Sequence, residues 1–370
     1  LPQHRAMRSK LAVLALTTLL ALPAAAQDLK PVVVARGLDH PWALAFLPEG
    51  RLLVTERPGR MRIVERDGKL GEPLAGLPAV AAGGQGGLLD VALHPQFASN
   101  RLVYWTFSEP GDGSAGTAVA RGRLEGNALR DVQVIFRQLP KVGGGNHFGS
   151  RLVFARDGRL FVGLGDRFHR KDDAQALDNH MGKVVRIEAD GAVPSDNPFA
   201  ARAGAKPEIW SLGHRNIQGA ALHPASGVLW TTEHGPQGGD ELNVSQAGAN
   251  YGWPVITYGR NYGIGTRIGE GTERADVVPP VAHWVPTSIA PSGLAFLTSD
   301  RYPGWKGQLF IGALRAQKLV RIELDGTRVV AQHDLLADRG ARIRDVRQGP
   351  DGWLYVLTDE ADGQIWRLER

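Results

Sequence analysis

Alternating apolar and polar residues recur along the chain as pairs of short segments joined by a turn. In each pair, a turn containing Pro, Asp or Gly separates two segments rich in β-branched, aromatic and leucine residues. This period of two predicts strands that are buried on at least one face. The first segments of the six pairs lie at 42–46, 89–95, 151–154, 219–224, 293–296 and 344–347, and the second segments at 51–55, 102–106, 159–163, 228–232, 308–312 and 353–358.

Successive pairs begin roughly 45 to 75 residues apart, a spacing that fits four-stranded units with loops of unequal length. Six copies predict an all-β fold, a six-bladed β-propeller of four-stranded antiparallel blades packed in a ring. We expect the strand at 31–35 to join the last blade beside 363–368 and so to remove an open sheet edge. A pair of β-sandwiches with coincidental repetition is the alternative. The longest interruptions, about 164–207 and 233–292, are expected to be loops that carry a site.

Composition narrows the chemistry. Gly and Pro, with 47 and 23 of 370 residues, supply many turns and disfavour a helical bundle. The sequence contains no Cys, which excludes disulfides, thiolate metal sites, iron–sulfur clusters and a Cys nucleophile. Any metal must therefore be held by oxygen or imidazole. The sequence also lacks a phosphate-binding loop ending in Lys-Ser/Thr, a dinucleotide-binding unit and a G-x-S-x-G elbow.

The first 26 residues have the pattern of a secretory signal peptide. A short basic segment at 7–10 precedes an apolar run at 11–22 and small residues at 23–26, and the run is too short to span a bilayer. Met7 is the expected true start. The alternatives are a buried strand or a membrane anchor. Residues 27–370 are expected to form a single catalytic propeller domain, soluble and exported to the periplasm.

Removing this leader changes the charge. The leader holds Arg5, Arg8 and Lys10 and no acid, so the formal net charge falls from +5 to +2. A nucleic-acid partner is therefore not expected. No later segment is apolar enough to predict a membrane span.

Two loops place acid–base residues after glycines. His147 follows Gly143-Gly144-Gly145, and an imidazole acts as a general base near neutral pH; a structural turn is the other interpretation. Asp166 follows Gly165 at the end of the next strand. A carboxylate there suits the orientation of an imidazole, although Asp after Gly is also ordinary turn chemistry.

Arg215 and three further segments suit ligand binding. Arg215 offers a planar fork for a carboxylate or quinone oxygen, or for a rim salt bridge. The oxygen-rich, Gly-bearing segments 233–236 and 239–243 suit Ca²⁺. The aromatic segment 250–254 suits packing as much as binding.

Arg342 and Arg344 should share one face of a strand, because residues i and i+2 point the same way. Two like charges there need an anion, such as an anionic cofactor, or solvent. By contrast, the repeated His-Pro pairs at His40, His94 and His223 are expected to be structural, because they recur in the same turn position.

Together these loops resemble the glucose/sorbosone dehydrogenase family, and within it the periplasmic aldose sugar dehydrogenases that depend on pyrroloquinoline quinone (PQQ). The resemblance runs from about Leu38 to the C-terminus. The segments that carry it are 84–90, 146–152, 213–216, 233–236, 240–243, 250–254 and 342–346.

The resemblance implies PQQ over the mouth of the central channel and oxidation of an aldose at C1 to the lactone. His147 matches the base that takes the proton of the anomeric hydroxyl, while hydride passes to the quinone. Asp166 matches the acid that supports this His, and Arg215 matches the guanidinium beside the reacting quinone oxygen. Electrons would then pass to an external acceptor.

The resemblance also implies a ligand set. Cofactor-contacting positions are matched by Gln85, Asn216, Arg342 and Arg344, and by Arg315, where some relatives carry Lys. The backbone carbonyls of Gly235 and Pro236 match ligands of a Ca²⁺ ion that polarises PQQ. Glu241 and Tyr251 match a second, structural Ca²⁺ site. His234 stands where the well-studied glucose enzymes carry Gln.

Two other functions compete with the dehydrogenase. A Ca²⁺-dependent lactonase needs an exposed metal and an acidic side chain that is free to act as the general base. It does not need a set of Arg side chains on one face. The other alternative is a non-catalytic extracellular binding propeller. That function does not explain why the His–Asp pair and the Arg set occur together. A monomer and a homodimer are both compatible with the sequence.

Overall fold

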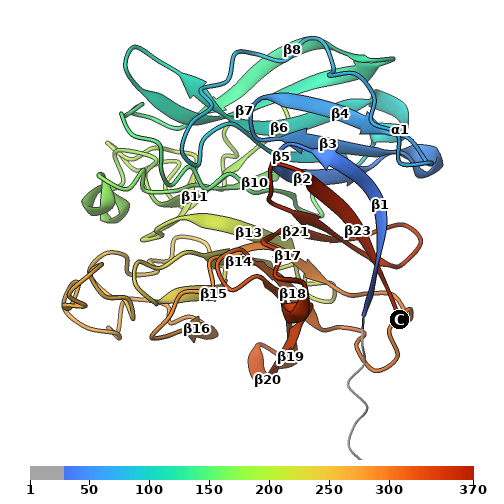
Figure 1. The fold of residues 1–370 in the computed structure, drawn as a ribbon. Coiled ribbons are helices and arrows are strands. Elements are labelled where there is room, and N and C mark those ends of the chain that lie inside the picture. Colours follow the sequence, from blue (N-terminus) through green and yellow to red (C-terminus); the bar gives the residue numbers. More distant parts are fainter. Residues whose placement is uncertain (1–28) are drawn as a thin grey trace, which may run out of the picture.

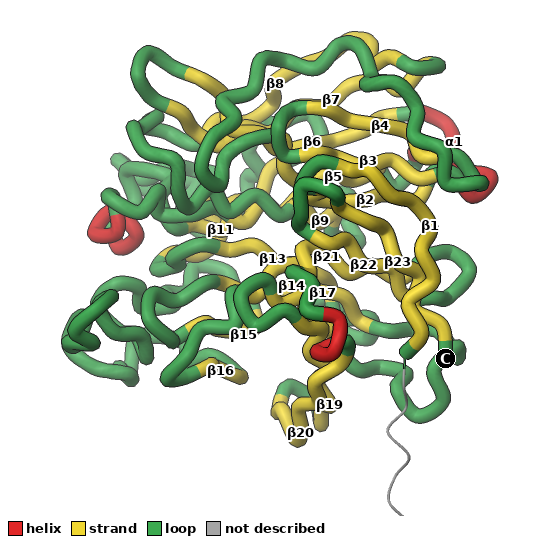
Figure 2. The backbone as a smooth tube through the Cα atoms, in the orientation of Figure 1, coloured by secondary structure: helices red, strands yellow, loops and turns green. Residues whose placement is uncertain are grey.

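The computed structural model describes residues 29–370, which form six antiparallel sheets arranged as a six-bladed β-propeller (Figure 1). The backbone consists of strands and long loops with only short helical turns (Figure 2). In chain order the strands are β1 (Lys30–Leu38), β2 (Pro41–Phe46), β3 (Leu52–Glu56), β4 (Arg60–Val64), β5 (Leu88–Leu93), β6 (Leu102–Pro110), β7 (Ala115–Glu125), β8 (Ala128–Arg137), β9 (Leu152–Phe154), β10 (Leu160–Gly163), β11 (Lys183–Ile187), β12 (Ile209–Leu212), β13 (Ile217–Leu222), β14 (Leu229–Glu233), β15 (Asp240–Val244), β16 (Ala282–Trp284), β17 (Pro291–Phe296), β18 (Leu309–Ala313), β19 (Lys318–Asp325), β20 (Arg328–Leu335), β21 (Ile343–Gln348), β22 (Leu354–Thr358) and β23 (Gly363–Glu369). The helical turns are η1 (Pro48–Gly50), α1 (Phe97–Asn100), η2 (Lys171–Gln175) and η3 (Ala337–Arg339).

The six repeated segment pairs are confirmed as the first two strands of the six sheets. These first strands are β2, β5, β9, β13, β17 and β21, and each contacts the next around the ring, with β21 returning to β2. They surround a central channel. Apolar clusters fill the space between neighbouring sheets, as where Trp42 of β2 packs in one cluster with Leu89 of β5 and Trp105 of β6. Packing between blades therefore supplies the core that one sheet lacks.

The ring is closed by the two ends of the described chain, as the sequence predicts. Strand β1 pairs antiparallel with β23, and Val32 lies opposite Arg367. In Figure 1 the blue first strand lies beside the red last strand. The pairing completes the sheet β1-β23-β22-β21, so this sheet joins the start of the chain to its end.

Two expectations about the fold need correction. Segments 164–207 and 233–292 contain strands β11, β15 and β16 and are not continuous loops. Strand β15 has the sequence Asp-Glu-Leu-Asn-Val and is mostly buried. Because three of these residues are polar, the strand shows no apolar periodicity and was not predicted. In addition, the sheet β2-β3-β4 has three strands in the part of the chain that the structure describes, where four were expected.

The three His-Pro turns are of two kinds. His94 and His223 follow the first strands of their sheets, and the Nδ1 atom of each accepts a hydrogen bond from the backbone N–H two residues on. His40 instead precedes β2 and pairs through Nδ1 with Asp359 at 2.8 Å. A structural role is thus borne out for His94 and His223, whereas the expectation of one shared turn position was wrong for His40.

The predicted signal peptide lies outside the described residues. Within residues 29–370, no helix is long and apolar enough to cross a membrane.

Candidate active site

A cavity of about 560 Å³ gathers predicted site residues from segments far apart in the sequence. Its walls come from the loops before β5 and β9, between β12 and β13, after β14, on either side of β16 and after β18. The predicted residues that line it are Gln85, His147, Arg215, Gly235, Pro236 and Arg315.

At the edge of this cavity, His147 is bound to Asp166, as predicted. The His147 Nδ1 atom lies 2.6 Å from Asp166 Oδ1, and both side chains are buried. The backbone N–H of His147 donates to Gln85 Oε1 at 2.9 Å. Since Nδ1 is engaged by the carboxylate, Nε2 is the ring nitrogen left for a ligand.

The environment sets the charges of this pair. Burial lowers the pKa of His147, although the hydrogen bond to Asp166 works in the opposite direction. Burial alone would raise the pKa of Asp166, but the hydrogen bond with His147 and the Arg215 charge leave it below its usual value. The pair therefore consists of a neutral imidazole and an ionised carboxylate at neutral pH, which is the resting state of a general base.

Backbone contacts bring the two loops together. A Cβ atom at Gly165 would lie 2.0 Å from the carbonyl oxygen of His147, so only glycine allows this approach. Asp166 Oδ2 accepts a hydrogen bond from the Trp253 indole at 2.8 Å. Sequence reasoning missed this role of Trp253, because the two residues are 87 positions apart and no local signal connects them.

Arg215 lies across the cavity wall. Its Nη1 donates to the carbonyl oxygens of His234 and Gly235 at 3.0 and 2.6 Å, and its Nη2 donates to the Tyr262 hydroxyl at 3.0 Å. Within residues 29–370, buried Arg215 Nε, Asn216 Nδ2 and His234 Nε2 have no hydrogen-bond partner. Buried polar atoms are normally paired, so these three atoms are available to a ligand bound at this site.

Arg342 and Arg344 do not line this cavity. Arg344 is buried, and its Nη2 atom lies 2.5 Å from Asp359 Oδ2. Arg342, which directly precedes β21, lies 3.7 Å from the same oxygen. The two guanidiniums do meet one anion, but that anion is Asp359 of this chain.

The predicted metal ligands already make hydrogen bonds. The Pro236 carbonyl accepts from Ser288 Oγ at 3.1 Å, and the Gly235 carbonyl accepts from Arg215. Within residues 29–370 there is no cluster of three or more His, Asp or Glu side chains arranged to hold a metal. A cation at this site would therefore depend on backbone carbonyl oxygens.

Glu241 and Tyr251 lie near a second pair of buried polar residues, His214 and Glu233. Burial raises the pKa of Glu241 well above its usual value, and the neighbouring Glu233 charge adds to this. The Tyr251 ring stacks on His214 at 4.7 Å, and His214 Nδ1 lies 2.7 Å from Glu233 Oε2. Glu241 thus lies opposite Glu233 in the β14–β15 pair, and Tyr251 packs on the His214 ring that binds Glu233.

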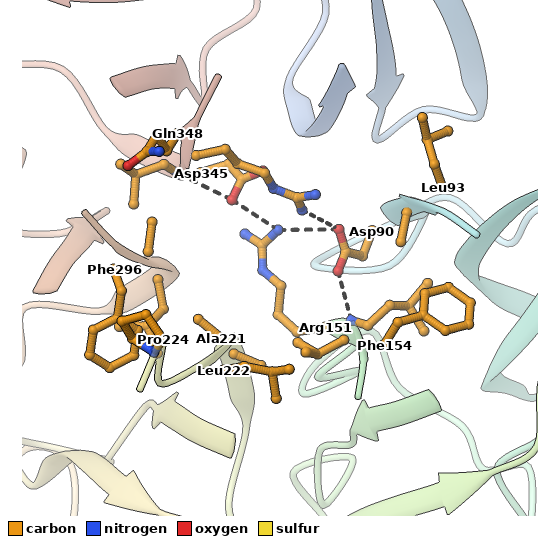
Figure 3. A pocket seen from close by; sticks show the side chains of 18 of the residues that line it. Asp90, Leu93, Arg151, Phe154, Ala221, Leu222, Pro224, Phe296, Asp345 and Gln348 are labelled. Carbon is orange, nitrogen blue, oxygen red and sulfur yellow. Dashed lines mark hydrogen bonds and ion pairs between the residues drawn. The ribbon is translucent and has the colours of Figure 1, made fainter. Parts of the chain in front are cut away.

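At another part of the channel, a cavity of about 400 Å³ is lined by strands β5, β9, β13, β17 and β21 (Figure 3). Arg151 Nη1 lies 3.5 Å from Asp90 and 3.2 Å from Asp345. Arg347 lies 2.6 Å from Asp90 and 2.9 Å from Asp345. Two cations and two anions therefore neutralise one another here, and we call these four residues the channel tetrad.

Comparison with known proteins gives consistent results. The sequence profile described as glucose/sorbosone dehydrogenase matches residues 38–367. The chain is 49% identical to an aldose sugar dehydrogenase of Escherichia coli (strain K12) over 354 residues, covering 94% of this chain and 95% of that protein. Among solved structures, the apo form of the soluble aldose sugar dehydrogenase from E. coli has a TM-score of 0.90 at 48% identity, covering 92% and 99% of the two chains. The PQQ-bound aldose sugar dehydrogenase from Streptomyces coelicolor has a TM-score of 0.77 at 31% identity, covering 92% and 98%.

Proposed function

The chain belongs to the glucose/sorbosone dehydrogenase family, and on this premise we propose that it is a PQQ-dependent aldose sugar dehydrogenase. The observation that carries the proposal is the buried His147–Asp166 pair at a cavity that also contains Arg215 and Arg315. The reaction converts the anomeric hydroxyl of an aldose to the carbonyl of a lactone. One proton and one hydride leave the sugar.

The residues of the cavity fit PQQ, an anionic tricarboxylate quinone. Arg215 and Arg315 supply positive charge and planar donors for carboxylate or quinone oxygens. Gln85 lines the cavity, and the unpaired amide nitrogen of Asn216 adds a donor beside it. Arg342 and Arg344 remain in the proposal as nearby positive charge, since the Arg344 charge acts on His234 in the cavity wall. When bound, PQQ supplies the acceptor for the hydride that leaves the anomeric carbon.

His147 takes the proton from the anomeric hydroxyl at Nε2. Asp166 fixes the ring through Nδ1 and stabilises the imidazolium as it forms. Arg215 places a cation where negative charge develops. These three residues thus act on the proton and on the charge, while the redox step belongs to the cofactor.

Calcium is the metal proposed for this site, held in part by the carbonyl oxygens of Gly235 and Pro236, since oxygen ligands suit Ca²⁺. A second, structural Ca²⁺ is proposed at Glu241 and Tyr251. We further propose that the chain is exported to the periplasm and passes its electrons to an external acceptor.

The test begins with the cofactor-free mature chain. PQQ binding is measured by calorimetry with and without Ca²⁺, and dye reduction is measured against a panel of aldoses. We expect turnover only with PQQ and Ca²⁺ together, and a loss of about 10²- to 10⁴-fold in kcat for His147→Ala. His223→Ala is the matched control, because His223 lies in a structural turn, and it should keep its activity. Absence of PQQ binding would overturn the assignment and favour a binding propeller.

A further inference from the structure

An exposed phenylalanine lies directly beside the catalytic pair. Phe168 is 38% exposed, and its ring packs edge-on against His147, with the ring centroids 5.3 Å apart and the planes at 76°. Phe168 is not itself part of the cavity lining, but its ring contacts His147, which is, so this aromatic face lies next to the place where a ligand would meet the base.

The backbone of this residue is held in an uncommon conformation. Arg167 and Phe168 have φ values of +57° and +65°, in the left-handed region that bulky residues seldom adopt. Two successive residues of this kind persist only where surrounding contacts fix them, and such places are often functional.

Two sets of contacts fix this turn. The Phe168 N–H donates to Asp166 Oδ1 at 2.8 Å, the same oxygen that binds His147. The buried Arg167 side chain donates to the backbone carbonyl oxygens of Asn146, Ala115 and Gly144. One carboxylate oxygen thus sets the position of both the base and the phenylalanine ring.

We propose that Phe168 is the apolar platform on which the sugar ring rests while its anomeric hydroxyl meets His147. This inference rests on the proposed function, and it assigns a substrate-positioning role to a residue outside the predicted site. The matching chemistry is that of a pyranose ring, which presents C–H groups on its two faces and hydroxyls around its edge. An aromatic ring binds such a C–H face, while hydroxyls need polar partners.

A second aromatic residue supports this arrangement. Tyr262 lines the cavity and is 60% exposed, and its hydroxyl is held by Arg215 at 3.0 Å. Two aromatic rings held by the groups that carry the chemistry would favour sugars whose face toward them lacks an axial hydroxyl. Phe168 is thereby a specificity-determining residue.

The test compares Phe168→Ala with Phe168→Trp, which restores an aromatic face. The probe is 1,5-anhydroglucitol, a sugar without the anomeric hydroxyl, and its binding to PQQ-loaded protein is measured by calorimetry. We expect Phe168→Ala to weaken its binding and to raise the KM for glucose about three- to tenfold, with kcat much less affected. Phe168→Trp should recover most of the loss.

Val330→Ala, which removes another exposed apolar side chain on β20, is the control and should change neither quantity. Across aldose epimers, Phe168→Ala should narrow the spread of kcat/KM. Unchanged probe binding and an unchanged spread would overturn the platform. A wild-type protein that binds no PQQ would instead overturn the proposed function, so the two failures are distinguishable.

Discussion

Two groups of polar side chains, one in the central channel and one at the active-site cavity, differ in how completely they are paired. In the channel tetrad, Arg151 faces Asp90 and Asp345 (Figure 3). Arg347 pairs with the same two carboxylates, and Arg151 also donates to the backbone oxygens of Gln218 and Arg344. At the active-site cavity, Arg215 and its chain neighbour Asn216 are buried, but the described residues leave some of their polar atoms unpaired. Buried polar side chains that pair fully with one another stabilise the fold. Buried polar side chains with unpaired atoms can bind a ligand.

Among the changes that test this comparison, removing a cation from the channel tetrad should have the largest effect on stability. Arg151→Met leaves Asp90 and Asp345 buried with one positive partner fewer, and we expect a loss of about 3–5 kcal/mol in the free energy of unfolding. Urea denaturation measures it. Arg328→Ala, at an exposed pair on β20, is the control and should leave the midpoint in place. An unchanged midpoint for Arg151→Met would show that the tetrad is not structural.

In the cavity, Asp166→Asn should affect activity more than stability. We expect kcat/KM to fall about a hundredfold, because the imidazolium loses its counter-charge. Activity needs neutral His147, so it is lost as the pH falls through the pKa of that residue. Burial holds this pKa below its usual value and Asp166 raises it. The acid limb of the wild-type profile should therefore lie below about 6.5, and the Asn variant should shift it further down.

An upward shift of that limb would contradict this assignment of charges. Trp253→Phe is the matched variant, since it removes an N–H donor to Asp166 and keeps the carboxylate. Its pH profile should change less.

A ligand bound at the active-site cavity should stabilise the folded protein as a whole. Free PQQ with Ca²⁺ at tenfold its Kd is expected to add about 1.4 kcal/mol to the free energy of unfolding, seen as a rise in Tm. The rise should shrink in Arg315→Gln and after chelation of Ca²⁺. A Tm that ignores PQQ would mean that the unpaired polar atoms do not mark its site.

The smallest effect is expected at the rim of the tetrad cavity. Gln348 Oε1 accepts the Thr298 N–H at 2.7 Å and the Ser299 N–H at 3.3 Å. Gln348→Ala should cost about 0.5–1 kcal/mol and leave dye reduction unchanged. A clear loss of activity would show that this part of the channel also takes part in catalysis.

The sequence predicted the fold well, because its signal is local. Each strand pair and its turn lie within about twenty residues, so the period of two is visible without tertiary information. Strand β15 was missed for the opposite reason, since Asp240 and Glu241 are buried by contacts formed only in the folded chain.

The site was predictable only in part. His147 and Asp166 stand near strand ends beside glycines, and this pattern brought them to notice. Arg342 and Arg344 do approach one anion, but that anion is Asp359 of this chain, and no local pattern shows that a carboxylate fifteen residues away lies beside Arg344. The contact of Trp253 with Asp166, and the strained turn at Phe168, depend on chain segments that only the fold brings together.

The pairing of β1 with β23 determines when the propeller ring can close during synthesis. Lys30 lies opposite Glu369, so β1 is synthesised more than three hundred residues before the strand with which it pairs. Until residues 363–369 leave the ribosome, β1 and β22 lack β23, the strand that lies between them. Each of the two then exposes an edge that can pair with another chain. A truncation of only these residues should therefore yield an aggregation-prone chain, although it removes none of the residues assigned to catalysis.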